Sequence, residues 1–542
     1  MPVQLDEIGR KTGVRIGSTV LSLAVTVTAC LGCLAGDAPC FNYPRLFGVR
    51  PGSPIIFRLP VSGDRPMRFS AEGLPAGARL DAATGILSGS CLDKATNRVV
   101  FKVENAYGSI SQDFRLVVGD EFQLTPPMGF NTFGGLGCGE RLNERTVRAS
   151  IAALVDKGLA DHGYAYCNVD DGWQGERGGE FMALQPNAKF GDMRRLADHV
   201  HALGLKFGIY STPYVTSYAR FPGGSSLHPD RNTAIGVVQR DVGPYLFDTN
   251  DARQVIAWGC DYFKYDWKMR IPEWGTDPKR RWRSVDLAER MGRLLHAAPR
   301  DICVENSHHC DFAFMDRITA AGNMTRVDGD LMDVWYRTQL PRRPWLGVRD
   351  LWLVQRDPEW RRRNRPGHWN MPCPLRLGMM GGWEGSDHPM HPTRLDRHEQ
   401  RAHMSLWCLW ASPIIIGAPI DQLDDFTLSL LTNDEMLAVN QDPLGIQAEE
   451  HVVPGGEVLV KRLEDGDVAV GLFNVSDEEG MKTVTVDWTQ AGITGPQRVR
   501  DLWARRDLPE ASGSFSASVP RHGCVVVRFT PTSRTFWKGI HD

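Results

Sequence analysis

The sequence predicts a multidomain protein in which a (β/α)8 TIM barrel stands between an N-terminal Ig-like β-sandwich and a C-terminal antiparallel β-sandwich. A chain of 542 residues is too long for one ordinary domain, and 42% hydrophobic with 23% charged residues indicates sizeable globular cores. Short strand patterns without helical periodicity occupy residues 42–120 and 446–532. Strand and helix patterns alternate over residues 124–440, which is typical of parallel βαβ units.

The first 36 residues have the pattern of a secretory signal peptide. Arg10, Lys11 and Arg15 precede an uncharged run over residues 16–36, which ends in small residues before Asp37. We therefore expect an exported protein, periplasmic or extracellular. The run is long enough that an uncleaved membrane or lipid anchor is the alternative, and membrane association is expected only through this segment.

Residues 42–120 are expected to form a small β-sandwich of immunoglobulin-like type. Gly-rich and Pro-rich turns such as residues 73–77 separate the expected strands, which are residues 53–59, 79–81, 86–88, 99–103 and 114–118. The run over residues 73–89 resembles the Ig-like modules attached to bacterial exported enzymes. No cluster of polar residues suited to chemistry is present there, so a spacer or docking module is predicted.

The central region supplies eight strand patterns with helical patterns between them. The helix expected over residues 145–159 places Val147, Ile151 and Leu154 on one apolar stripe. Near-continuously apolar strands followed by amphipathic helices predict a closed barrel. The expected strands are residues 127–133, 164–171, 205–211, 262–266, 302–305, 325–328, 368–370 and 413–416, and further helices are expected at 193–203, 251–257, 284–297 and 396–410.

Helical patterns stop after residue 445. The strands expected beyond it are residues 458–462, 467–474, 483–487, 498–503 and 524–529. They predict the C-terminal antiparallel β-sandwich, a domain that packs against a catalytic domain more often than it carries a site.

Charge and cysteine usage argue against several classes of partner. The net charge is −3 and no basic run is interleaved with aromatic residues, so no nucleic-acid partner is expected. None of the 12 cysteines forms a CxxC pair near a second one, so no structural zinc is expected. The nearest metal candidate is the run from His308 to Asp311, but adjacent residues rarely bind one ion together. We expect no metal and no cofactor.

The strand expected at residues 262–266 carries two charged residues on one face. Lys264 and Asp266 are two positions apart, so their side chains point the same way. Burying them is costly unless each has a partner or a task. A structural ion pair in the core and a catalytic site are both compatible with this strand alone.

Function in such a barrel is expected at the C-terminal ends of the strands. Carboxylates there can bind paired sugar hydroxyls, and aromatic faces can cover the apolar side of a pyranose. Asp170 and Asp171 could instead serve only as a turn and helix cap, and Asp328 as a solvated loop carboxylate. The expected strand ends carry Asn131, Phe133, Asp170, Asp171, Tyr210, Lys264, Asp266, Glu305, Arg326, Asp328, Asp330, Trp369 and Asn370.

Six motifs in order make the resemblance to a known family specific. The chain resembles glycoside hydrolase family 27, the α-galactosidase and α-N-acetylgalactosaminidase (melibiase-like) family, from about residue 124 into the C-terminal sandwich. The motifs are Pro126-Pro-Met-Gly-Phe-Asn-Thr-Phe133, Gly163-Tyr-Ala-Tyr-Cys-Asn-Val-Asp-Asp-Gly-Trp173, Leu203-Gly-Leu-Lys-Phe-Gly-Ile-Tyr210, Trp258-Gly-Cys-Asp-Tyr-Phe-Lys-Tyr-Asp266, Arg326-Val-Asp-Gly-Asp-Leu-Met-Asp-Val-Trp335 and Ala438-Val-Asn-Gln-Asp-Pro-Leu-Gly445.

The resemblance implies a retaining exo-glycosidase that hydrolyses terminal α-D-galactosyl residues of oligo- or polysaccharides by double displacement. It implies Asp266 as the nucleophile and Asp330 as the acid/base. Substrate-binding roles are implied for Phe133 (where the family usually has Trp), Asp170, Asp171, Tyr210, Lys264, Glu305, Arg326 and Trp369. Asp170 and Asp171 would hold the outer hydroxyls, and Lys264 would bridge a hydroxyl and the nucleophile.

This assignment agrees with the chemistry of retaining hydrolysis. Such a mechanism requires two carboxyl groups about 5–5.5 Å apart, one ionised and one protonated. Lys264 beside Asp266 is expected to favour the charged form of the nucleophile.

Several positions depart from the family pattern. Two carboxylates that the family usually has are Met371 and Cys373 here, and a usual cysteine is Lys268, while Cys138 lacks its usual partner. Alternative substrates are therefore an α-N-acetylgalactosaminide, a β-L-arabinopyranoside and an isomaltose-type glucan. A catalytically weak sugar-binding protein is the remaining alternative.

Overall fold

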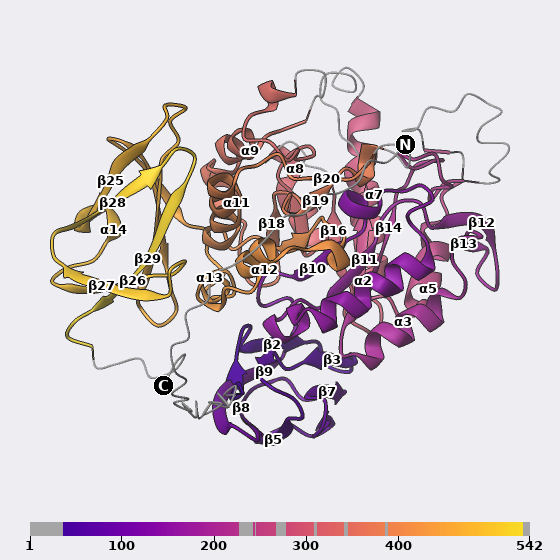
Figure 1. Ribbon diagram of the computed structural model, residues 1–542. Coiled ribbons are helices and arrows are strands. Elements are labelled where there is room, and N and C mark those ends of the chain that lie inside the picture. The colour runs from indigo at the N-terminus through magenta and orange to yellow at the C-terminus, as the bar shows by residue number, and fades with distance from the viewer. Residues whose placement is uncertain are drawn as a thin grey trace, which may run out of the picture. The chain divides into compact units, whose positions relative to one another are not determined.

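The computed structural model describes residues 36–226, 242–243, 245–266, 278–307, 312–340, 345–384 and 389–534 (Figure 1). The predicted signal peptide, Lys268 and the metal candidate at 308–311 lie outside the described residues. Those predictions therefore remain predictions. None of the described helices has the length and the apolar character needed to cross a membrane.

Eight parallel strands form the central sheet, in the order β18-β17-β16-β15-β14-β11-β10-β21. A parallel bridge between Leu375, which follows β18, and Ile416 of β21 links the two ends of this order. The predicted TIM-like barrel is thereby confirmed. The strands are β10 (Met128–Asn131), β11 (Tyr166–Val169), β14 (Lys206–Ser211), β15 (Tyr262–Tyr265), β16 (Cys303–Asn306), β17 (Met324–Arg326), β18 (Trp369–Met371) and β21 (Ile414–Ile416).

Helices such as α2 (Glu144–Asp156) and α3 (Met193–Ala202) pack outside these strands through one apolar stripe. In α2 (Glu144–Asp156) the buried residues include Val147, Ile151 and Leu154, as the periodicity predicts, and an Asn143–Thr146 capping box begins the helix. The helices α3 and α5 contact each other outside the strands (Figure 1). The further helices of this region are α1 (Phe133–Leu136), α3 (Met193–Ala202), α5 (Asp248–Trp258), α7 (Pro278–His296), α8 (Phe312–Ala321), α9 (Val348–Gln355), α10 (Pro358–Arg361), α11 (Arg397–Leu409), α12 (Asp425–Leu431) and α13 (Asp434–Asn440).

Short elements extend the loops between the strands and helices of the barrel. They include two small antiparallel hairpins and four single-turn 3-10 helices. The hairpins are β12 (Gln174–Gly178) with β13 (Ala183–Pro186) and β19 (Met379–Met380) with β20 (His391–Pro392), and the 3-10 helices are η1 (Leu159–His162), η2 (Arg337–Gln339), η3 (Gly382–Glu384) and η4 (Ile420–Gln422).

A separate apolar cluster is formed mostly by side chains that point from the strands into the barrel. It contains Tyr166, Tyr262 and Trp369, with Phe122, Cys303, Met324, Met371, Ala411 and Ile415. Gly208 leaves room for these rings, because a Cβ there would lie 2.7 Å from Cβ of Tyr262 and 2.2 Å from Oδ1 of Asn168. The barrel is therefore filled by side chains below the level of the candidate site.

The N-terminal domain is a β-sandwich with its own core, which includes Phe57, Leu87, Val99, Phe101 and Leu116. Its sheets are β2-β9-β8-β5, β3-β7-β6 and β1-β4. The strands are β1 (Cys40–Phe41), β2 (Leu46–Val49), β3 (Ile55–Arg58), β4 (Val61–Ser62), β5 (Arg68–Glu72), β6 (Ala78–Leu80), β7 (Ile86–Gly89), β8 (Ala95–Asn105) and β9 (Gly108–Val118). The predicted Ig-like sandwich is confirmed.

The C-terminal domain has a six-stranded antiparallel sheet, β22-β23-β24-β29-β26-β27, and a two-stranded sheet, β25-β28. Val470, Val484 and Phe529 lie in the core between them. This arrangement confirms the predicted sandwich. The elements are β22 (Glu449–Val453), β23 (Gly456–Arg462), β24 (Val468–Phe473), β25 (Met481–Asp487), α14 (Trp488–Ala491), β26 (Gln497–Asp501), β27 (Arg506–Ala511), β28 (Ser514–Pro520) and β29 (Cys524–Pro531).

Candidate active site

The polar residues predicted for the site gather at the C-terminal ends of five neighbouring strands. Asp170 follows β11, Asp266 follows β15, and Asp330 lies in the loop after β17. Backbone register links the strands across this edge: Tyr210 of β14 is opposite Lys264, and Lys264 is opposite Glu305. The barrel therefore gathers residues that are up to 160 positions apart in the sequence.

Asp170 is the centre of a buried polar network. Its Oδ2 accepts hydrogen bonds from Nδ2 of Asn131 at 2.6 Å and from Nζ of Lys264 at 2.8 Å. Its Oδ1 accepts a hydrogen bond from the backbone N–H of Asp171 at 2.8 Å. With 2% of its surface exposed, Asp170 depends on these donors for the solvation that water would otherwise supply.

Lys264 forms an ion pair with Asp170, which follows strand β11. Burial opposes the charge on Lys264, but the carboxylates of Asp170, Glu305 and Asp266 outweigh burial and raise the pKa of Lys264. The ammonium group also lies 5.6 Å from the ring centroid of Tyr210. The positive charge of Lys264 is therefore shared among three carboxylates, of which Asp266 is one.

Replacing Lys264 by methionine is expected to lower the free energy of unfolding by about 3–5 kcal/mol. The change leaves the Asp170 carboxylate buried without its cation, and broken buried pairs cost about this much. Urea unfolding followed by circular dichroism measures the effect. Lys94→Met is a matched control, because the Lys94–Asp120 pair is exposed and should cost less than about 1 kcal/mol. Equal losses for both variants would contradict the prediction.

Hydrogen bonds hold Asp266 at the end of strand β15. The hydroxyl of Tyr210 donates to Oδ2 of Asp266 at 2.8 Å, and the backbone N–H of Asp266 donates to the carbonyl of Ser211 at 2.8 Å. Burial, followed by the nearby charge of Asp266, raises the pKa of Tyr210 well above its ordinary value. The Tyr210 hydroxyl therefore stays protonated and remains a donor to the carboxylate.

Asp330 has a more open environment. Its side chain is 45% exposed, against 6% for the residue Asp266 as a whole, and its Oδ1 accepts a hydrogen bond from Nη2 of Arg326 at 3.1 Å. The same nitrogen donates to the carbonyl of Gly329 at 3.0 Å. Arg326 thus anchors both the loop and its carboxyl group.

Two further buried carboxyl groups have raised pKa values. Burial raises the pKa of Glu305, although Lys264 and Arg326 act against it, and the hydroxyl of Tyr262 donates a short hydrogen bond to Glu305. Burial also raises the pKa of Asp171 to about 7 against hydrogen bonds that include one from the backbone N–H of Ala219. Asp171 is therefore bound by the loop that contains Ala219, and it is also a candidate for sugar binding.

Trp369 lies apart from the charged residues of the candidate site. This residue is fully buried in the barrel interior, and its Nε1 donates to the carbonyl of Gln123 at 3.0 Å. Gln123 precedes β10, so the indole lies toward the N-terminal ends of the strands, away from the charged residues. The implied role of Trp369 as a substrate contact stays a prediction, and the structure places this residue at the start of its strand, β18, rather than after it.

Phe133 also lies differently from the expectation. The first strand ends at Asn131, and Phe133 begins the short helix α1. Its backbone N–H donates to Oδ1 of Asn131 at 2.9 Å, and its side chain is half-buried. Phe133 remains beside the site, because Asn131 binds Asp170 directly.

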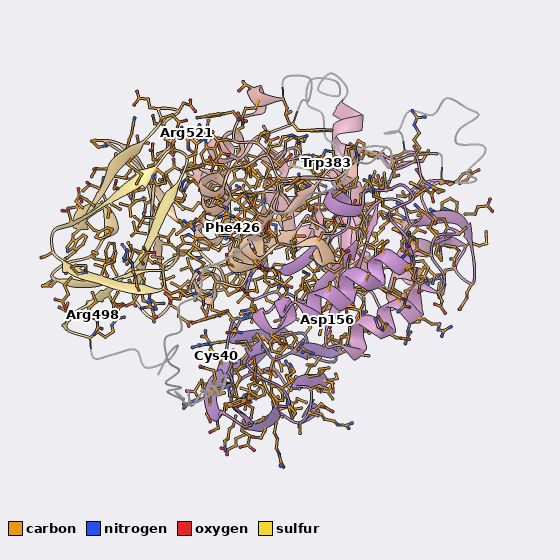
Figure 2. All side chains as sticks on the ribbon, viewed as in Figure 1. Cys40, Asp156, Trp383, Phe426, Arg498 and Arg521 are labelled. Atoms are coloured by element: carbon orange, nitrogen blue, oxygen red, sulfur yellow. The ribbon has the colours of Figure 1, made fainter. Side chains whose placement is uncertain are left out.

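The sequence pattern assigns no role to two residues that lie beside the site. Asn131 stands at a predicted strand end but is not assigned a function there, although it donates to Asp170. Arg376 has its guanidinium carbon 4.7 Å from the ring centroid of Trp383, which Figure 2 labels. The sequence signal for Arg376 is its place three residues after Cys373, beyond the seventh strand.

The described residues include no group of three His, Cys, Asp or Glu side chains that could hold a metal ion. The cysteines within the described ranges are all free thiols, among them Cys138 and Cys373. A cluster of carboxylates, one lysine, one arginine and aromatic rings can bind hydroxyl groups and carry acid/base or nucleophilic chemistry.

Comparison with known families assigns the three domains separately. Residues 137–442 match the family model described as "Alpha galactosidase A". Residues 454–529 match "Alpha galactosidase C-terminal beta sandwich domain", and residues 38–119 match "Putative Ig domain".

Curated proteins and solved structures agree with these matches. An alpha-galactosidase of Cyamopsis tetragonoloba is 31% identical over 417 residues, 76% of this chain and 87% of that protein. Alpha-galactosidase A of Cellvibrio japonicus is 30% identical, covering 76% of this chain and 93% of that protein. A solved structure described as a putative alpha-galactosidase of Bacteroides fragilis has a TM-score of 0.77 at 30% identity, covering 92% of this chain and 98% of that one. A β-L-arabinopyranosidase of Geobacillus stearothermophilus shares the fold, with a TM-score of 0.62 at 24% identity, covering 76% and 98%.

Proposed function

Because the chain belongs to the α-galactosidase (melibiase) family of glycoside hydrolases, we propose that it is a retaining exo-glycosidase releasing terminal α-D-galactosyl residues from oligo- or polysaccharides. The observation that supports this most is the pair of unlike carboxyl groups at the barrel mouth. Asp266 is buried and bound by Tyr210, whereas Asp330 is partly exposed beside Arg326. Retaining hydrolysis requires such a division between a nucleophile and an acid/base.

In the proposed first step, a carboxylate oxygen of Asp266 attacks the anomeric carbon while Asp330 gives its proton to the departing glycosidic oxygen. In the second step Asp330 takes a proton from water, which attacks the anomeric carbon and releases Asp266. The hydrogen bond from Tyr210 favours the ionised form of Asp266. The exposure of Asp330 is consistent with access for the leaving group and then for water.

The buried network around Asp170 is the proposed binding site for the outer hydroxyl groups of the sugar. The Asp170 carboxylate accepts from Asn131 and Lys264, so its position is fixed before substrate arrives. Such preorganised groups lose little conformational entropy on binding. Asp171, Glu305 and Lys264 are the proposed further hydroxyl partners, and Phe133 the proposed apolar contact.

A panel of aryl glycosides tests the sugar specificity. We expect turnover of the α-galactoside to exceed turnover of the α-N-acetylgalactosaminide, the β-L-arabinopyranoside and the α-glucoside, with NMR showing α-galactose as the first product. A preference for the β-L-arabinopyranoside is the second candidate, because Met371 and Cys373 stand where the resemblance leads one to expect carboxylates. Binding of galactose without turnover of any glycoside would instead indicate a sugar-binding protein.

Export remains part of the proposal, motivated by the charged start and the uncharged run of residues 16–36. Expression of the full chain in a bacterial host, followed by fractionation and N-terminal sequencing, tests it. A mature form that starts near Asp37 outside the cytoplasm would support cleavage, whereas full-length protein in the membrane fraction would indicate the anchor.

A further inference from the structure

Cys373 lies at the centre of a buried group of hydrogen-bond donors, two residues beyond β18. Its Sγ accepts from Nη2 of Arg326 at 3.6 Å, from Nη2 of Arg376 at 3.6 Å and from the backbone N–H of Leu331 at 3.4 Å. Cys373 itself is 0% exposed. We propose that Cys373 is a thiolate that positions Asp330, an inference whose catalytic part rests on the proposed function.

The hydrogen bonds of the sulfur support the ionised form. Three N–H groups donate to Sγ, and in the described part of the chain no acceptor is recorded for a thiol proton of Cys373. A neutral thiol is only a weak acceptor, whereas a thiolate is a charged acceptor that gains from each N–H donor. Neighbouring arginine residues are one of the known causes of thiolate formation.

The balance of buried charge gives a second, independent reason. Arg326 and Arg376 are 2% and 5% exposed, and a guanidinium group is always charged. Asp330 pairs with Arg326, but within the described ranges no carboxylate forms an ion pair with Arg376. A buried cation without a counter-charge is strongly unfavourable, and a Cys373 thiolate supplies that charge.

The other titratable group in contact with Arg376 cannot supply it. The backbone N–H of Arg376 donates to Nε2 of His403 at 3.1 Å. Burial, followed by the charge of Arg376, lowers the pKa of His403 to about 3, so this ring is neutral at physiological pH. Nε1 of Trp407 donates to the backbone carbonyl of Cys373 at 3.1 Å and not to its sulfur. In the part of the chain that the structure describes, Sγ of Cys373 is thus the acceptor that both guanidinium groups share.

The same contacts connect Cys373 to the proposed acid/base. Leu331 follows Asp330 directly; its N–H donates to Sγ of Cys373, and its carbonyl accepts from Nε of Arg376 at 2.9 Å. Arg326 bridges Sγ and the carboxyl group of Asp330. Cys373 therefore fixes Asp330 through the backbone on one side and through a guanidinium on the other. It is a positioning residue, because it touches neither the substrate nor the reacting atoms.

Ultraviolet difference spectroscopy tests for the thiolate without any assay of activity. At neutral pH, the wild-type protein minus Cys373→Ser is expected to show the absorption of one thiolate. Cys138→Ser is the matched control, because burial raises the pKa of Cys138 to about 11 and its subtraction should show none. If Cys373→Ser does not fold, native protein is compared with urea-unfolded protein at the same pH, and loss of one thiolate on unfolding is expected. Absence of the band in both measurements would overturn the proposal.

Kinetics of three variants test the positioning role. Cys373→Asp keeps the negative charge and should keep kcat/KM within about 10-fold, whereas Cys373→Ser and Cys373→Ala should lower it about 100-fold through misplacement of Asp330. The alkaline limb of the pH profile should move to lower pH in Cys373→Ser, because the uncompensated positive charge favours ionisation of Asp330. In Cys373→Asp this limb should return to its wild-type position. A serine variant with wild-type kinetics and pH profile would overturn the positioning role. A thiolate band together with a fully active Asp330→Asn variant would instead contradict the proposed function.

Discussion

Replacing Asp266 by asparagine is expected to lower kcat on an aryl α-galactoside by about 10⁴- to 10⁶-fold, the range seen when a covalent nucleophile is removed. An amide at this position can still accept the hydrogen bond from Tyr210, so the fold should persist while the nucleophile is lost. Initial rates and the unfolding midpoint, measured on the same preparation, separate the two effects. A variant with wild-type kcat would exclude Asp266 as the nucleophile.

Azide distinguishes a lost nucleophile from a disturbed pocket. In Asp266→Ala, azide can occupy the space of the missing carboxylate and attack the anomeric carbon from the same side, giving the β-galactosyl azide. Asp261→Asn is the matched control at the other end of β15. Asp261 is bound by His201 and Arg300, so its change should lower stability and leave kcat of the folded protein near wild type.

The domain order and the barrel could be predicted because strand patterns depend on local periodicity. The eight observed strands fall within or beside the predicted ranges, as with β14 (Lys206–Ser211) against residues 205–211. Helices with one apolar stripe, such as α2, were predictable for the same reason.

The partners of the charged residues could not be predicted in this way. Lys264 and Asp266 share a face in the sequence, but the ion pair of Lys264 is with Asp170, 94 residues away. Trp369 shows a related limit. Period-two alternation indicates that a side chain points into the barrel, but the stagger of the strands decides whether it lies at the catalytic or the opposite end.

Cys373 illustrates how a change of residue type can mislead. From sequence, cysteine in place of a carboxylate indicates a lost charge near the sugar. In the structure, two guanidinium groups and a backbone N–H surround its sulfur, and these donors favour a negative charge at that position. Side-chain chemistry depends on neighbours that come from separate loops, here the one after β17 and the one after β18.

Replacing Asp330 by alanine is expected to lower kcat/KM by about 10²- to 10⁴-fold on natural galactosides, the usual contribution of a general acid. The loss should be much smaller on aryl galactosides with acidic phenols, because such leaving groups depart without a proton. Rates for a series of phenols, plotted against the phenol pKa, should therefore show a steeper dependence in the variant than in the wild-type enzyme.

Azide should also test the role of Asp330, and its product should have the anomeric configuration opposite to that from Asp266→Ala. In Asp330→Ala the glycosyl-enzyme on Asp266 still forms from an activated substrate, and azide needs no general base to attack it, so the product should be the α-galactosyl azide. Asp328→Asn is the control from the same loop, since Asp328 accepts the N–H of Gly329 and lies two residues from the proposed acid/base. If Asp328→Asn reproduced the steep leaving-group dependence and the azide product while Asp330→Ala did not, the proton transfer would belong to Asp328, and the hydrogen bond from Arg326 to Asp330 would be structural.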